Sequence, residues 1–163
     1  MRFYFLSIAI TSILAQENPV FPHEIVSLSG ELIPMEKLAR NKTVCVITVK
    51  SPQCPVCQEQ LVRIKKKLHE FSTCNLTFLV LAPGNPVDIH AMKKFTEFPF
   101  SFISNDQYAI AEKYGLVQTA DQLMPAVFIL NPDLSMRWIQ RGRSSGFYSD
   151  KILIDYLDCG NWI

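Results

Sequence analysis

The chain has 163 residues, of which 48% are hydrophobic and 19% are charged. This length and composition are typical of one compact domain and argue against a disordered chain. Because its 16 basic and 15 acidic residues nearly cancel, we expect neither nucleic acid nor an anionic membrane as a partner.

The N-terminal residues 1–15, MRFYFLSIAITSILA, are typical of a secretory signal peptide. A positive charge at Arg2 precedes an apolar stretch that is shorter than the roughly 20 residues a membrane-spanning helix needs. Ile13 and Ala15 suit the two small-pocket positions before a cleavage point. An N-terminal core helix is the alternative. We expect residues 16–163 to form the mature domain, without membrane insertion after cleavage.

Two triplets match the acceptor pattern for N-glycosylation and begin at Asn41 and Asn75. Such triplets also arise by chance. Asn41 lies in a polar turn where a glycan would fit, whereas Asn75 lies at the start of a predicted strand. The C-terminus, LDCGNWI, carries no retention tetrapeptide. The expected location is therefore outside the cell or in the lumen of the endoplasmic reticulum or secretory pathway, with the choice open.

The first predicted elements are a hairpin and a buried strand. Residues 24–38 contain two apolar runs around Ser29-Gly30, a two-residue turn that tolerates positive φ. Residues 43–49, TVCVITV, form a near-continuous β-branched run, which is typical of a strand covered on both faces.

A helix is predicted from Cys54 to Phe71, because apolar residues recur there at intervals of three and four. Three consecutive lysines, 65–67, crowd its end, where cations complement the helix dipole. We interpret this lysine run as a solvated face and not as a site for nucleic acid.

The rest of the chain alternates strands and helices. We expect strands at 76–82, 98–104, 126–131 and 135–142, and helices at 87–98, 106–115 and 149–157, the last with Ser149 as its N-cap. Together with the N-terminal hairpin, this order predicts an α/β fold in which helices flank both faces of a central mixed β-sheet.

Cys54 and Cys57 form a Cys-x-x-Cys motif at the junction between the buried strand and the following helix. The N–H groups at a helix start and the positive end of its dipole stabilise an anion, so they favour a thiolate at Cys54. One turn later, Cys57 brings its sulfur within reach of a reversible disulfide. Pro55 fits the first helical turn. The motif predicts that Cys54 attacks a substrate disulfide and that Cys57 resolves the mixed disulfide, or the reverse when the pair is oxidised.

A zinc site is a weak alternative, because it would need a second pair of ligands. No ligand-like spacing appears among Cys45, Cys74, Cys159, His23, His69 and His90. An inert structural disulfide is a stronger alternative, because secreted chains use many. However, a four-residue loop removes little unfolded-state entropy, so this bond would stabilise the fold little. We expect no metal and no cofactor.

The other three cysteines have different expected roles. Cys45 falls in a buried strand and is expected to act as a small hydrophobic residue. Cys74 and Cys159 could pair with each other, but a sequence alone cannot assign connectivity. Free thiols and a bond to another chain are the alternatives.

Four stretches together resemble the redoxin or AhpC/TSA branch of the thioredoxin superfamily: EIVSLSGELI, VCVITVKSPQCPVCQEQL, FPFSFISNDQYAIAEKYGL and MPAVFILNPDLSMRWIQRG. The resemblance covers roughly residues 24–157. It implies a thioredoxin-like fold and a thiol–disulfide oxidoreductase acting on protein thiols and disulfides, with a separate reductant or oxidant. In that family the proline that matches Pro125 is cis and faces the cysteine pair. The preceding residue, here Met124, then offers backbone hydrogen bonds to an incoming substrate.

The chain departs from thioredoxins proper in three ways. They carry a tryptophan before the first cysteine and Gly-Pro between the two, whereas this chain has Gln53 and Pro55-Val56. They also place a buried, proton-carrying aspartate six residues before the first cysteine, where this chain has Thr48. The intervening dipeptide tunes the reduction potential, and the direction of exchange stays open.

Peroxiredoxins also resemble this chain and provide the alternative function, a thiol peroxidase. They use a Thr-x-x-Cys motif, and one residue separates CPVC from their Thr-Pro-Val-Cys version, so Cys57 takes the place of the peroxidatic thiol. Where they carry an arginine before the FILN-like strand, this chain has Pro125, so a peroxide oxygen would lose its cationic partner. A third hypothesis is a non-catalytic binding module of thioredoxin fold, which the retained cysteines and proline disfavour.

Overall fold

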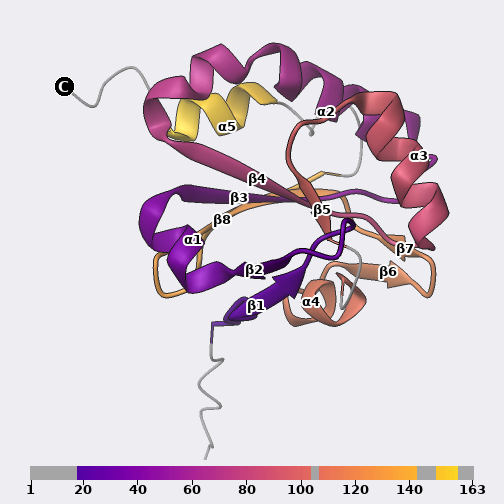
Figure 1. Ribbon diagram of the computed structural model, residues 1–163, viewed down its shortest axis with the longest axis horizontal. Coiled ribbons are helices and arrows are strands. Elements are labelled where there is room, and N and C mark those ends of the chain that lie inside the picture. The colour runs from indigo at the N-terminus through magenta and orange to yellow at the C-terminus, as the bar shows by residue number, and fades with distance from the viewer. Residues whose placement is uncertain (1–17, 104–106, 143–149, 158–163) are drawn as a thin grey trace, which may run out of the picture.

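The computed structural model describes residues 18–103, 107–142 and 150–157 (Figure 1). The expected signal peptide, residues 1–15, and the expected N-cap Ser149 lie outside these residues. In the part of the chain that is described, no helix is long and apolar enough to span a membrane.

A mixed sheet of five strands forms the centre of the molecule, in the order β5-β4-β3-β8-β9. The middle strand, β3, runs parallel to β4 and antiparallel to β8. At the two edges, β5 pairs with β4 in parallel and β9 pairs with β8 antiparallel. The bounds are Thr43–Thr48 for β3, Leu76–Leu81 for β4, Ser101–Ile103 for β5, Ala126–Leu130 for β8 and Met136–Arg141 for β9. The expected mixed sheet is therefore confirmed.

Helices cover both faces of this sheet (Figure 1). One face carries α2 (Pro55–Lys66), α3 (Pro86–Thr96), the 3₁₀ helix η1 (Leu68–Cys74) and α5 (Asp150–Leu157). The other carries α1 (Met35–Asn41), α4 (Gln107–Lys113) and the hairpin of β1 (Glu24–Val26) and β2 (Leu32–Pro34). Each face has its own apolar core, because buried strand residues point alternately to the two sides.

Three elements differ from the sequence-based expectation. The expected hairpin is confirmed, but its second strand ends at Pro34, and the residues after it form α1, a helix that buries only Met35 and Ala39 and is too short for a periodic signal. The predicted helix over 54–71 ends at Lys66, and Phe71 belongs to η1. Because Phe71 still packs into the same core as Ile64, the apolar spacing continues past the end of the helix.

A small hairpin that the sequence did not reveal precedes β8. It consists of β6 (Val117–Thr119) and β7 (Gln122–Leu123), which pair antiparallel. It leads the chain into residues 124 and 125, so it positions one side of the region around the cysteine pair.

Candidate functional site

The cysteine pair lies where β3 leads into α2. Cys54 is the N-cap of α2, and its sulfur accepts a hydrogen bond from the backbone N–H of Cys57 at 3.4 Å. Pro55 follows in the first turn, where it costs no helical hydrogen bond. The loop before the helix is held by the Cys54 N–H, which donates to the Ser51 carbonyl, and by the Gln58 side chain, which donates to the Pro52 carbonyl. The local chain thus fixes the first sulfur at a helix N-terminus.

The two sulfurs lie 2.6 Å apart as free thiols. A disulfide bond is about 2.05 Å long, so only a small movement separates the dithiol from the disulfide. The spacing in the sequence predicted this proximity. The redox role of the pair stays a prediction at this point.

Burial distinguishes the two thiols. Cys54 is half-buried, whereas Cys57 is 1% exposed and packs in the core beneath α2. Burial raises the pKa of the Cys57 thiol to about 12, and its hydrogen bond with Cys54 acts in the same direction, while the backbone N–H and the charge of Lys50 oppose the rise. Cys57 is therefore held in the protonated form at neutral pH. Cys54 is the thiol that a dissolved reactant can reach.

Residues 123–125 lie beside this junction because β8 pairs with β3. Thr48, the last residue of β3, faces Ala126 in the register. Lys50 joins the two segments: its N–H donates to the Cys57 sulfur at 3.4 Å, and its carbonyl accepts from the N–H of Leu123 at 3.2 Å. The sheet therefore places the expected substrate-binding residues next to the loop that carries the cysteines.

The peptide bond between Met124 and Pro125 is trans, and this corrects the cis geometry that the resemblance implied. Both backbone groups of Met124 are already engaged: its N–H donates to the Leu116 carbonyl and its carbonyl accepts from the Thr48 hydroxyl, each at 2.6 Å. A substrate strand that used the Met124 N–H would have to replace its bond to Leu116, whereas the carbonyl has a second lone pair to offer. Substrate binding by Met124 and Pro125 therefore stays a prediction.

Thr48 occupies the position of the thioredoxin aspartate and has a structural role here. It is fully buried, and its hydroxyl is bound to the Met124 carbonyl. A hydroxyl is a poor proton carrier at neutral pH compared with a carboxyl group. The proton of Cys57 must therefore leave by another route.

Neither Cys45 nor Cys74 joins the pair. Cys45 is fully buried in β3, and burial raises the pKa of its thiol to about 12, which agrees with its expected role as a small hydrophobic residue. Cys74 is disulfide-bonded, so it is not a free thiol, and Cys159, with which it could pair, lies outside the described residues. Among the residues that the structure describes, no group of three or more metal-binding side chains lies together.

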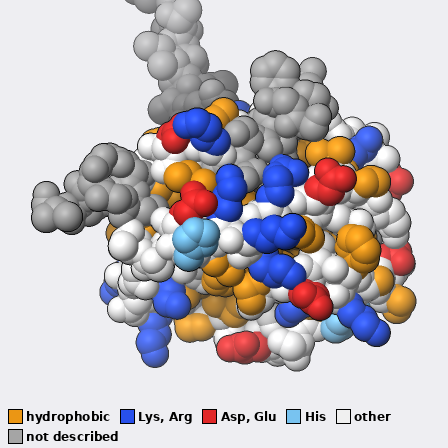
Figure 2. All heavy atoms as spheres, turned by 90° about the horizontal axis from the view of Figure 1, so that it is seen from above, with side chains coloured by type: hydrophobic (Ala, Val, Ile, Leu, Met, Phe, Trp, Pro, Cys, Tyr) orange, Lys and Arg blue, Asp and Glu red, His pale blue; other side chains and the backbone are white. Residues whose placement is uncertain are grey.

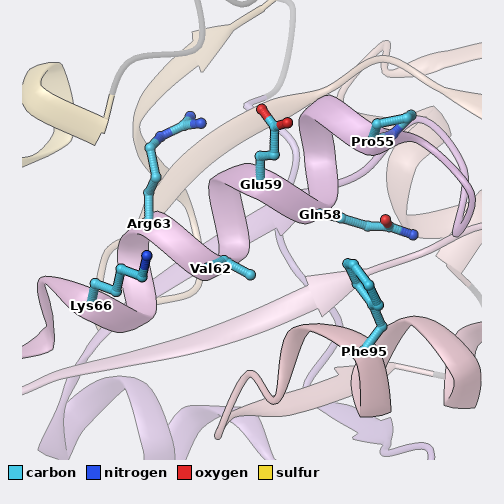
Figure 3. A pocket seen from close by; sticks show the side chains of 7 residues that line it. All are labelled: Pro55, Gln58, Glu59, Val62, Arg63, Lys66 and Phe95. Atoms are coloured by element: carbon cyan, nitrogen blue, oxygen red, sulfur yellow. The ribbon is translucent and has the colours of Figure 1, made fainter.

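A groove beside the pair was not foreseen from the sequence. It has a volume of about 480 Å³, begins at Pro55 and runs along α2, with Phe95 of α3 as its opposite wall (Figure 3). Its lining is Pro55, Gln58, Glu59, Val62, Arg63, Lys66 and Phe95. The signal in the sequence was Phe95, a large apolar residue on the solvent side of a helix, but only the fold brings it opposite α2.

The fold and the dithiol together define a thiol-based oxidoreductase with a thioredoxin-like architecture. The chain belongs to the AhpC/TSA family, whose model matches residues 16–139. A search of curated protein sequences found no match.

Several solved structures share the fold. Peroxidoxin BcpB from Mycobacterium tuberculosis is 13% identical with a TM-score of 0.74, over 88% of this chain and 97% of that one. A C45S mutant of peroxiredoxin 6 of Arenicola marina is 18% identical with a TM-score of 0.71, over 86% of this chain and 71% of that one. Plasmodium vivax 2-Cys peroxiredoxin is 16% identical with a TM-score of 0.68, over 86% of this chain and 93% of that one.

The difference in burial predicts that the two thiols react at different pH values. In a Cys57→Ser variant, iodoacetamide should modify Cys54 at neutral pH, because solvent reaches this sulfur. In a Cys54→Ser variant, Cys57 should react at least about 100-fold more slowly, and its rate should keep rising above about pH 9, because its raised pKa keeps it protonated there. Peptide mass spectrometry measures both rates. Equal rates at neutral pH would contradict the assignment.

Proposed function

We propose that this protein is a thiol peroxidase that reduces a peroxide with two electrons from the Cys54–Cys57 dithiol. The observation that carries the proposal is the pair of free sulfurs 2.6 Å apart, one accessible and one buried. Membership of the AhpC/TSA family and the similarity of the fold to peroxiredoxins support a peroxide as the oxidant. These comparisons favour peroxide reduction over disulfide exchange.

The chemistry proceeds in two steps. The Cys54 thiolate attacks the near oxygen of the peroxide, the O–O bond breaks, and the leaving alkoxide or hydroxide takes a proton to give an alcohol or water. Cys54 is then a sulfenic acid. The Cys57 sulfur attacks the Cys54 sulfur, the disulfide forms, and the hydroxyl leaves as water with the Cys57 proton. A dithiol reductant must then restore the pair.

Lys50 is a positive charge that acts on the cysteine pair. Pro125 occupies the position of the peroxiredoxin arginine, so the cation is absent there. The charge of Lys50 acts on Cys57 and lowers its pKa against the effect of burial. A cation near the sulfurs favours negative charge as it develops on the peroxide oxygens.

A second candidate function is thiol–disulfide exchange with protein substrates. It is favoured by the deeper burial of Cys57 relative to Cys54. In peroxiredoxins the residue that matches Cys57 would attack first, but here Cys57 is the buried thiol and Cys54 the accessible one. This order fits a dithiol in which Cys54 forms a mixed disulfide and Cys57 resolves it. The presence of Pro125 in place of the arginine also favours disulfide exchange over peroxide reduction.

Peroxide consumption with dithiothreitol as reductant tests the first proposal. The wild-type protein should turn over hydrogen peroxide or an alkyl hydroperoxide, and Cys54→Ser should lose at least about 100-fold in rate, because the remaining thiol is buried and protonated. In a separate reaction without dithiothreitol, which would itself reduce a sulfenic acid, Cys57→Ser should stop at a sulfenic acid that a dimedone probe traps. Turnover that survives Cys54→Ser and disappears in Cys57→Ser would assign the attack to Cys57. A wild-type protein without turnover would refute the peroxidase.

Insulin reduction tests the second candidate on the same preparations. If exchange is the main activity, the wild-type protein should precipitate the insulin B chain faster than dithiothreitol alone, and both single variants should be inactive, because release of the mixed disulfide needs both sulfurs. Turbidity measures the rate. Wild-type-like exchange in Cys54→Ser would refute this mechanism, and the ratio of the peroxide and insulin rates decides between the two candidates.

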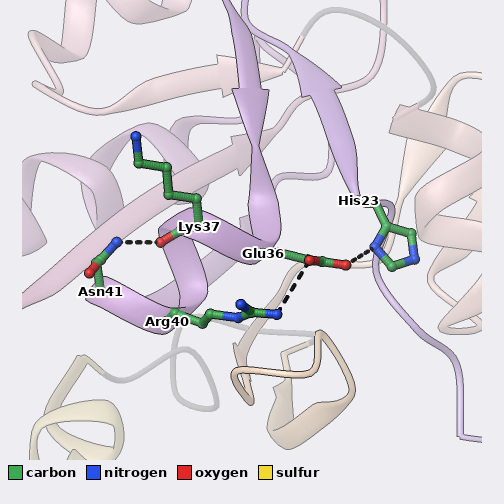
Figure 4. A network of polar contacts seen from close by, with 5 residues as sticks. All are labelled: His23, Glu36, Lys37, Arg40 and Asn41. Atoms are coloured by element: carbon green, nitrogen blue, oxygen red, sulfur yellow. Dashed lines mark hydrogen bonds and ion pairs between the residues drawn. The ribbon is translucent and has the colours of Figure 1, made fainter.

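We also propose that the protein passes through the secretory pathway. The disulfide at Cys74 supports this, because stable disulfides are rare in reducing compartments. Both glycan acceptors, Asn41 and Asn75, are exposed. They are adjacent, because the Asn75 side chain donates a hydrogen bond to the Asn41 carbonyl at 2.7 Å. The Asn41 side chain donates in turn to the Lys37 carbonyl (Figure 4).

A non-reduced peptide map of the protein secreted by eukaryotic cells tests this location. We expect the map to begin near residue 16, to contain a linked Cys74–Cys159 peptide and to carry a glycan at Asn41, because its side chain is exposed on the surface. A retained N-terminus with no glycan and with Cys74 reduced would exclude the secretory route.

A further inference from the structure

The groove between α2 and α3 begins at the residue that follows Cys54. Pro55 forms the end of the groove that is nearer to the cysteines, and Val62 lines it farther along α2. Phe95 points from α3 toward α2 (Figure 3). Its volume of about 480 Å³ falls within the range of about 300–1,000 Å³ that is typical of ligand pockets. A peroxide is far smaller and does not need it. It has room for a large side chain of another protein together with part of the segment that carries it.

Exposed apolar residues occur on α3 and at the start of α2, the two helices that form this groove. Phe95 is 69% exposed and Val87 is 76% exposed. With Ala91 they form a stripe at intervals of four along the solvent side of α3, while Ile89 and Met92 fill its buried side. Val56, beside the cysteine pair, is also exposed. An exposed apolar stripe beside a groove is a feature that docking sites for other proteins share.

The charges on the same two helices select the kind of partner. Between their bounds, α2 and α3 carry five basic residues against two acidic ones, although the whole chain is nearly neutral. Arg63 and Lys66 border the far end of the groove, and Glu59 lies nearer to the cysteines. Lys and Arg side chains gather between hydrophobic ones on the face shown in Figure 2. A second copy of this chain would bring like charges together here, so an acidic partner fits better.

We propose that this groove docks the protein that exchanges electrons with the Cys54–Cys57 pair. The docked segment carries one large apolar side chain, which lies against Phe95 and Val62, and acidic residues, which face Arg63 and Lys66. The inference rests on the proposed function in either of its two forms, because both need a protein thiol or disulfide to reach Cys54. Docking raises the effective concentration of the partner's sulfur at Cys54.

Peptides with an activated cysteine provide the probe. Each carries a mixed disulfide with thionitrobenzoate. The Cys54 thiolate bonds to the peptide sulfur, the peptide–thionitrobenzoate bond breaks, and the coloured thionitrobenzoate leaves with the electron pair. Cys57 then attacks the Cys54 sulfur, and the released peptide thiolate takes the Cys57 proton.

Three peptides form the set. One peptide contains leucine and glutamates, the second has lysines in place of the glutamates, and the third has alanine in place of the leucine. Glutathione–thionitrobenzoate is the reference for every variant.

We expect the wild-type protein to favour the leucine–glutamate peptide by roughly tenfold or more over the other two, relative to the reference. Phe95→Ala should abolish the advantage of leucine, and Lys66→Glu should reverse the preference between glutamate and lysine. Leu32→Ala and Lys37→Glu are matched controls, because both residues are exposed on elements at the other face of the sheet.

Three outcomes would overturn the docking site. The peptide preference could be absent, it could survive both groove variants, or it could change equally in the controls. A dimer in sedimentation that Phe95→Ala dissociates would assign the groove to a second copy and overturn the proposed partner. Failure of the proposed function has a different signature, since Cys54 would then react neither with the reference disulfide nor with peroxide.

Discussion

The different burial of two adjacent sulfurs is the constraint on which the site depends. Cys57 lies on the face of α2 that also carries Leu61 and Ile64, and all three pack into one core. The packing that holds α2 on the sheet therefore also keeps the Cys57 thiol protonated. Cys54, at the N-cap, lies just outside that core. An asymmetric dithiol thus follows from the position at which the helix begins.

This asymmetry changes how the peroxiredoxin-like features of the chain are understood. Peroxiredoxins place threonine at the position of Cys54 and arginine at the position of Pro125. With cysteine at position 54, the second electron donor is within the same helical turn, so no resolving thiol from elsewhere in the fold is needed. With proline at position 125, the chain lacks the cation that peroxiredoxins place at that position. In the proposed mechanism the two departures act together, because both favour a first attack by Cys54 over one by Cys57.

The sequence was sufficient to predict the elements that carry the sulfurs. The β-branched run that forms β3 and the cysteine spacing at the start of α2 are local signals, and both are confirmed. The contacts of Met124 could not be predicted in this way, because Thr48 is distant from it in the sequence and only the pairing of β3 with β8 brings them together. For the same reason, a groove with walls on α2 and α3 leaves no pattern in either helix alone.

The loss of the thioredoxin aspartate can be reconciled with the proposed chemistry by following the proton of Cys57. Thr48 cannot carry that proton, since its hydroxyl is held by the Met124 carbonyl. In peroxide reduction the proton leaves with the hydroxyl of the sulfenic acid as water. In disulfide exchange it leaves on the thiolate of the released partner, which is more basic than water. In both reactions the departing product provides the base at the moment when the Cys57 sulfur forms its new bond. A buried thiol with a high pKa can therefore act as the resolving group without a carboxylate at position 48, provided that Cys54 has attacked first.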